Sequence, residues 1–178
     1  MSLKRPPSPS TGAAAGGRGK SMLIAEPDRL VGIGFRCWLA GYRKGDISCW
    51  EQAWSDYTAV LGPSAARVAL SELSIWVRAV RDATAREIRV LPERCPHFCR
   101  DECVAIAMVA ASQHNACPAL RACTFALLGT SMIDEVVQGA ETFAATMREF
   151  GQILSPNSIF NVASLPHLPG AAQHAVMH

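Results

Sequence analysis

The residues of this 178-residue chain that are best suited to chemistry are its seven cysteines. Cys95, Cys99 and Cys103 follow one another at intervals of four residues, which places them on one side of a helix that turns by about 100° per residue. Cys117 falls on the same side if the helix continues. We therefore expect one helix, over about residues 96–115, to point this stripe of thiols towards a common neighbour.

Metal binding is the most direct chemical use of such a stripe. Thiols one turn apart are separated by about 6 Å along the axis, so two of them can reach one ion, whereas three span about 12 Å and need a cluster or a second helix. Zinc, copper(I) and iron–sulfur clusters select thiolate ligands, and the basic residues Arg94 and Arg100 would favour thiolates and redox sensing. The candidate ligands are Cys95, Cys99, Cys103, Cys117, Cys123, His97 and His114.

Buried structural thiols explain the same stripe without a ligand, because unpaired cysteine is among the most buried residue types. The spacing matches neither the paired C-x-x-C pattern of zinc sites nor that of the ferredoxins. The ladder over residues 95–123 resembles the cysteine ladders of the four-helix copper-storage bundles. Those bundles line several helices with cysteine, whereas Cys37 and Cys49 are the only cysteines before residue 95 here, so copper storage is not inferred.

Catalytic patterns are scarce in the chain. His97 lies two residues before Cys99, and an enzyme with Cys99 or Cys103 as its nucleophile is one alternative function. Neither E-x-x-H nor H-E-x-x-H occurs, so di-iron bundles and zinc proteases have no support. The adjacent acids Asp101 and Glu102 are expected in the first turn of a helix, where carboxylates interact favourably with the helix dipole.

The elements that must position these residues are helices. Apolar residues recur with helical periodicity in six segments, and no segment alternates between apolar and polar residues as a strand would. We therefore predict an all-α fold, a single-domain bundle or array of about six helices. The predicted helices cover approximately residues 27–44, 48–61, 64–90, 96–115, 118–128 and 131–150.

The composition divides the chain into three parts. Residues 1–22 hold four basic residues, no acid and many Pro, Gly and Ser residues, which predicts a disordered basic tail. Residues 23–154 form the helical domain, and residues 155–178, with three prolines, are expected to be a loosely ordered C-terminal tail. No apolar run reaches the ~20 residues of a membrane span and no signal peptide is evident, so we expect a cytoplasmic protein.

The function that these observations favour is that of a non-catalytic accessory or regulatory protein. Its cysteine segment would bind an iron–sulfur cluster, zinc or copper, or would sense redox state. The alternative is a helical protein-interaction module in which the cysteines are structural and Trp50 or Trp54 anchors the partner. The partner is expected to be another protein rather than a nucleic acid, because the folded part has 13 basic and 15 acidic residues.

Overall fold

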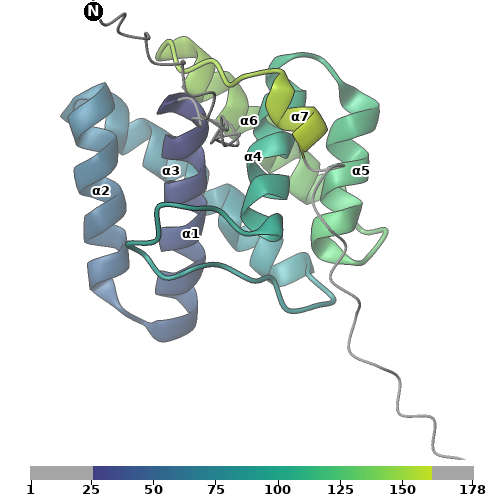
Figure 1. Cartoon of the computed structure of the whole chain (residues 1–178), viewed down its shortest axis with the longest axis horizontal. Helices are drawn as coiled ribbons and strands as arrows, with labels where there is room; N and C mark the ends of the chain where they lie inside the picture. Colours follow the sequence, from purple (N-terminus) through teal and green to yellow (C-terminus); the bar gives the residue numbers. More distant parts are fainter. Residues whose placement is uncertain (1–25, 162–178) are drawn as a thin grey trace, which may run out of the picture.

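The computed structural model describes residues 26–161, and within that range the chain forms seven helices and no strand (Figure 1). The prediction of an all-α, single-domain array is confirmed, with one short helix more than expected. The predicted N-terminal tail, 1–22, lies outside the described residues. The helices are α1 (Glu26–Lys44), α2 (Ile47–Leu61), α3 (Pro63–Ala83), α4 (Arg100–Gln113), α5 (Cys117–Leu128), α6 (Asp134–Glu149) and α7 (Asn157–Asn161).

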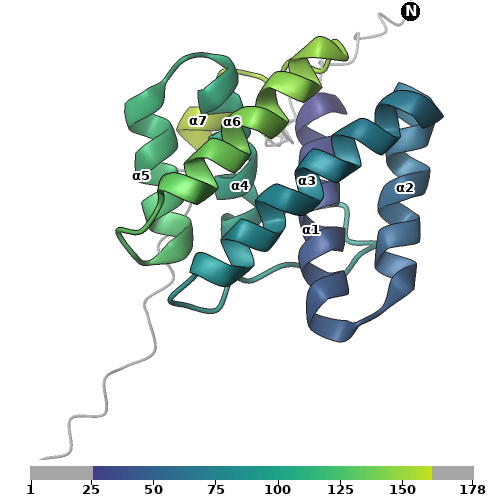
Figure 2. The same cartoon turned by 180° about the vertical axis from the view of Figure 1, so that it is seen from behind.

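Helix α4 is the central element of the array. It packs against α1, α5, α6 and α7, while α3 and α6 lie side by side across the opposite face of the molecule (Figure 2). All residues from Val104 to Ala111 are buried. A helix that is apolar all round belongs in the interior, and α4 is built of alanine, valine, isoleucine and methionine in this stretch. None of the helices within residues 26–161 has the length and apolarity needed to cross a membrane.

An aromatic stack joins three of the helices. Trp76 of α3 is fully buried, and its ring lies 5.6 Å from the ring of Phe35 in α1 and 5.6 Å from that of Phe143 in α6. Gly139 of α6 leaves room for this packing, because a Cβ atom there would lie only 3.2 Å from the Trp76 Cα atom. Trp76 therefore belongs to the core, whereas Trp54 is 41 % exposed.

The observed helix boundaries agree with the prediction at α2 but not between α3 and α4. Helix α2 begins at Ile47, one residue before the predicted start, and Asp46 caps it by accepting a hydrogen bond of 2.9 Å from the backbone of Ser48. Helix α3 ends at Ala83, earlier than predicted, and α4 begins only at Arg100. Residues 84–99 are instead an irregular segment, which we call the α3–α4 loop.

The last described residues are fastened to the array by buried polar side chains. Gln113 of α4 donates to the Gln152 carbonyl at 2.9 Å and accepts from the Leu154 backbone at 2.8 Å. Buried Asp28 of α1 accepts hydrogen bonds from the Ser155 backbone and from the Ser158 hydroxyl. Residues 155–161 of the predicted C-terminal tail therefore contain a short packed helix, α7.

Candidate functional site

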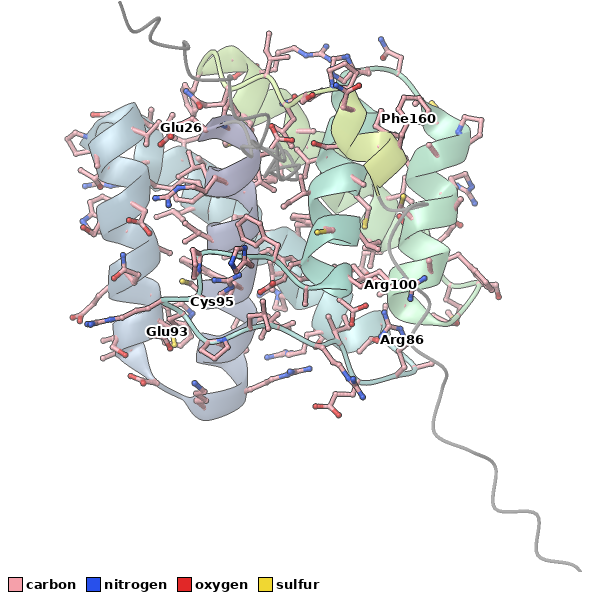
Figure 3. All side chains as sticks on the ribbon, in the orientation of Figure 1. Glu26, Arg86, Glu93, Cys95, Arg100 and Phe160 are labelled. Carbon is pink, nitrogen blue, oxygen red and sulfur yellow. The ribbon has the colours of Figure 1, made fainter. Side chains whose placement is uncertain are left out.

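The α3–α4 loop is the most unusual element of the fold. It leaves α3 near Arg86, crosses the front of α1, approaches α2 at Glu93 and Cys95, and returns to Arg100 at the start of α4 (Figures 1 and 3). Irregular connections of this length are uncommon inside a compact domain and usually serve a function. The contacts that hold the loop therefore define the candidate site.

A fully buried ion pair lies beneath the loop. The Arg36 Nε atom of α1 is 2.6 Å from the Glu102 Oε1 atom of α4, and Arg36 Nη2 is 3.2 Å from Oε2, so the pair is bidentate. Both side chains have an exposed fraction of 0 %. Taking two charges out of water is costly unless their remaining donors and acceptors are satisfied.

Backbone carbonyls of the loop satisfy the remaining donors of Arg36. Its Nη1 atom donates to the Cys95 carbonyl at 2.7 Å and, more weakly, to those of Pro92 and Glu93 at 3.3 and 3.4 Å. Its Nη2 atom donates to the His97 carbonyl. A single buried guanidinium thereby fixes the path of residues 92–97.

Glu102 and Phe98 complete this arrangement. The Glu102 carboxylate accepts hydrogen bonds from the backbone of Leu91 at 3.1 Å and from that of Cys99 at 2.7 Å. The Phe98 ring lies 4.9 Å from the Arg36 guanidinium and covers Gly32, where a Cβ atom would be 2.5 Å from the ring. The charged groups of Arg36 and Glu102 therefore both have several hydrogen-bond partners in the loop.

A second ion pair holds the start of the loop. Arg86 contacts both oxygens of Asp101 in the first turn of α4, at 2.7 and 3.0 Å, and it also donates to the Ala126 carbonyl of α5. Asp101 in turn accepts from the Arg89 backbone at 2.8 Å. The prediction that Asp101 and Glu102 occupy a first helical turn is confirmed, but their main partners are arginines and loop backbone.

The predicted stripe of thiols is divided among three elements. Because α4 begins at Arg100, Cys95 lies in the loop and Cys117 opens α5, so the expectation of one helix over 96–115 is wrong. Cys99 is the N-cap of α4, and its sulfur donates to the Arg89 carbonyl at 3.1 Å. Its role in the structure is to cap the helix and to hold the loop.

The other predicted ligands are also spread over the fold. Cys103 is half-buried in α4, Cys123 is buried in α5, and His97 is exposed on the loop. His114 follows α4, and its Nε2 atom lies 2.9 Å from the Leu154 carbonyl. Within residues 26–161, no three of the predicted ligands bring their ligand atoms within 4.8 Å of one another.

A different group of potential ligands does come together where the loop meets α2. Potential ligand atoms of Asp46, Cys49 and Glu93 all lie within 4.8 Å of one another. The Cys49 thiol donates to the Glu93 carboxylate at 2.7 Å, and Lys44 Nζ lies 3.8 Å from the same oxygen. No sequence pattern indicates this group, because 44 residues separate Cys49 from Glu93 and no local spacing connects them.

The environments of Cys37, Cys49, Cys99 and Cys103 raise the pKa values of these cysteines and favour thiols over thiolates. Burial and the Glu93 hydrogen bond raise the pKa of Cys49 to about 11, and burial with the neighbouring Cys49 and Glu93 raises the pKa of Cys37 to about 12. Burial raises the pKa of Cys99 to about 11 and also raises that of Cys103. Because the thiolate is the nucleophile, these shifts give no support to a cysteine-nucleophile enzyme.

The raised pKa of Cys99 predicts slow alkylation. A shift from 9.0 to about 11 lowers the thiolate fraction at neutral pH about 100-fold, since each pKa unit is a factor of ten. We expect Cys99 to react with iodoacetamide at pH 7 more slowly than free cysteine, and about tenfold faster at pH 8 than at pH 7. Mass spectrometry of the individual cysteines measures both rates. A Cys99 rate above that of free cysteine would instead favour a catalytic thiol.

Comparisons of the chain with protein-family models, with curated proteins and with solved structures find no match. The function is therefore inferred from the residues themselves.

Proposed function

We propose that the protein is a non-catalytic accessory protein that presents the α3–α4 loop to a partner protein with an acidic surface. The observation that carries this proposal is the buried Arg36–Glu102 pair, whose donors and acceptors are used to fix the backbone of the loop. A loop that is ordered before binding loses less conformational entropy when the partner docks. A buried ion pair adds little net stability, so its use here is to select one loop conformation.

The outward side chains of the loop indicate the chemistry of the partner. Arg89, Arg94 and the adjoining Arg100 are exposed, and none of them forms an ion pair within the described part of the chain. Exposed His97 lies between Arg94 and Arg100. Arginine is enriched at protein interfaces, where its planar guanidinium binds carboxylates in bidentate fashion.

A protein is favoured over a nucleic acid as this partner. Outside the first 22 residues, the chain has 13 basic and 15 acidic residues, so it lacks the excess positive charge that nucleic-acid binding requires. The basic residues are therefore a local feature suited to a defined acidic surface.

Charge reversal on the loop tests this proposal. We expect Arg89→Glu/Arg94→Glu to weaken partner binding about tenfold or more, because like charges that face each other across an interface cost several kcal/mol. The matched control is Arg67→Glu/Arg78→Glu, which makes the same charge change at exposed positions of α3. Circular dichroism of both variants checks that the helices are intact.

Photo-crosslinking identifies the partner for this comparison. A photoreactive amino acid at exposed His97 should join the chain to an acidic protein, and the adduct should disappear in the loop variant while persisting in the α3 control. Equal adducts in the wild-type chain and in the loop variant would overturn the proposal. So would loss of the adduct in the α3 control.

A further inference from the structure

The junction between α2 and the α3–α4 loop brings together a thiol and two carboxylates. Asp46 and Cys49 lie one turn apart at the start of α2, and Glu93 approaches them from the loop, beside Cys95 (Figure 3). Asp46 is exposed, Glu93 is half-buried and Cys49 is buried, so the group opens to solvent on the Asp46 side. An ion could enter from that side without displacing a helix.

A second buried thiol lies behind this group. Cys37 of α1 has an exposed fraction of 0 %, and the thiol hydrogen bonds found within residues 26–161 are made by Cys49 and Cys99. Cys37 shares a helical face with Gly34 and Gly41, which contact Tyr57 and Trp50 of α2. Cys37 therefore faces α2 with its sulfur unpartnered.

The donor set identifies the class of ion. One thiolate and two carboxylates suit a borderline divalent ion such as zinc, whereas copper(I) and iron–sulfur clusters require several thiolates. Bonds of about 2.0–2.3 Å to a tetrahedral zinc place its ligands about 3.6 Å apart, so the present separations need only small side-chain rotations. Three protein ligands leave the fourth position to water.

We propose that Asp46, Cys49 and Glu93 bind a divalent transition-metal ion of the zinc type and that the ion fastens the α3–α4 loop to α2. Binding displaces the proton of the Cys49 thiol to solvent and changes no oxidation state. The Cys49–Glu93 hydrogen bond is then replaced by two bonds to the ion. The deprotonated ligands carry a formal charge of −3, which exceeds the opposing charge of Lys44.

Proton release makes the affinity depend on pH. The Cys49 thiol donates its proton to the Glu93 carboxylate in a hydrogen bond, so it is protonated before an ion binds, and an ordinary cysteine thiol loses its proton only at about pH 8.5. Each bound ion must then release one proton, and the apparent affinity should rise about tenfold per pH unit between about pH 6 and 8. An affinity independent of pH over this range would contradict thiolate ligation.

Titration of the metal-free full-length chain with Co²⁺ tests the proposal. Cobalt replaces zinc in such sites, and a thiolate ligand gives it a sulfur-to-cobalt charge-transfer absorption. We expect this absorption from the wild-type chain and from Cys117→Ser, whose thiol is exposed at the start of α5, but not from Cys49→Ser. A band that persists in Cys49→Ser, or the absence of a band from the wild-type chain, would overturn the proposal.

The carboxylate ligands are tested with a matched pair of variants. Glu93→Gln is expected to weaken Co²⁺ binding about 100-fold or more, since even outer-shell partners of metal ligands are worth about 10–100-fold. Glu87→Gln, at an exposed position of the same loop, should have no effect. Asp46→Asn removes a ligand charge but keeps a residue that caps helices well. Weaker Co²⁺ binding by this variant would therefore not be due to unfolding of α2. Unchanged binding in both ligand variants would overturn the assignment, and no partner protein is involved.

Discussion

Replacing Arg36 by alanine is expected to lower the free energy of unfolding by about 3–5 kcal/mol, because it leaves a buried charge without its partner. Glu102 would keep its backbone donors from Leu91 and Cys99 but would lose the guanidinium. The carbonyl of Cys95 would lose its short hydrogen bond at the same time. Urea denaturation followed by circular dichroism measures the change in unfolding free energy.

An exposed ion pair provides the control for this variant. Arg121 and Asp134 form an ion pair of 3.0 Å with side chains that are mostly exposed. Arg121→Ala should therefore cost less than about 1 kcal/mol, since water screens such a pair. Equal losses of unfolding free energy in Arg36→Ala and Arg121→Ala would show that the buried Arg36–Glu102 pair contributes no more to stability than an exposed pair.

A double variant separates stability from positioning of the loop. Arg36→Met/Glu102→Leu removes both charges, and replacing a buried ion pair by apolar side chains is often neutral or stabilising. We expect it to recover part of the stability lost in Arg36→Ala while amide hydrogen exchange over residues 91–98 stays faster than in the wild-type chain. Slow exchange in the double variant would mean that other contacts hold the loop.

Helical periodicity predicts most of the fold because it reports on burial within each segment. Helices α1, α5 and α6 begin and end within about three residues of the predicted positions, and Gly45 and Gly129 follow α1 and α5 with positive φ angles of 64° and 69°. Such signals are local, because a turn glycine or an apolar stripe determines the structure of its own segment only. They predict which residues of a helix are buried but not which other helix those residues pack against.

The irregular loop could not be predicted because distant residues hold it. Pro96 can open a helix, and the periodicity after it extends the prediction from there to about residue 115. The observed start of α4 at Arg100 is instead set by Cys99 as cap and by the carboxylates of Asp101 and Glu102. Arg36, the partner of Glu102, lies 66 residues away from it on another helix, and no local pattern connects the two residues.

The thiol–carboxylate group is hidden in the sequence for the same reason. The regular spacing of the cysteines in residues 95–123 predicts a metal site there. In the structure, those thiols cap a helix, lie in the loop or belong to different helices. Cys49 has no cysteine or histidine within a helical turn, and Glu93 reaches it from a loop whose path is set by contacts with Arg36. The buried ion pair therefore positions the loop, and the loop in turn brings Glu93 to Cys49.

Replacing Trp76 by alanine should cost about 3–5 kcal/mol of unfolding free energy, as expected for truncating a large buried aromatic residue. Its ring contacts Phe35 and Phe143, so truncation would leave a cavity where α1, α3 and α6 meet and would remove contacts among all three helices. The close approach of Gly139 to Trp76 limits how far α6 can move to fill that cavity. Thermal unfolding followed by calorimetry measures the loss.

Trp54→Ala separates the structural role of tryptophan from a role in docking. Trp54 is 41 % exposed on α2, so its truncation removes less buried area than that of Trp76. Removing it should therefore cost clearly less stability than removing Trp76, since the hydrophobic contribution scales with the apolar area taken out of water. Equal losses in the two variants would place Trp54 in the core, whereas a stable Trp54→Ala chain that loses its partner would extend the docking surface from the loop to α2.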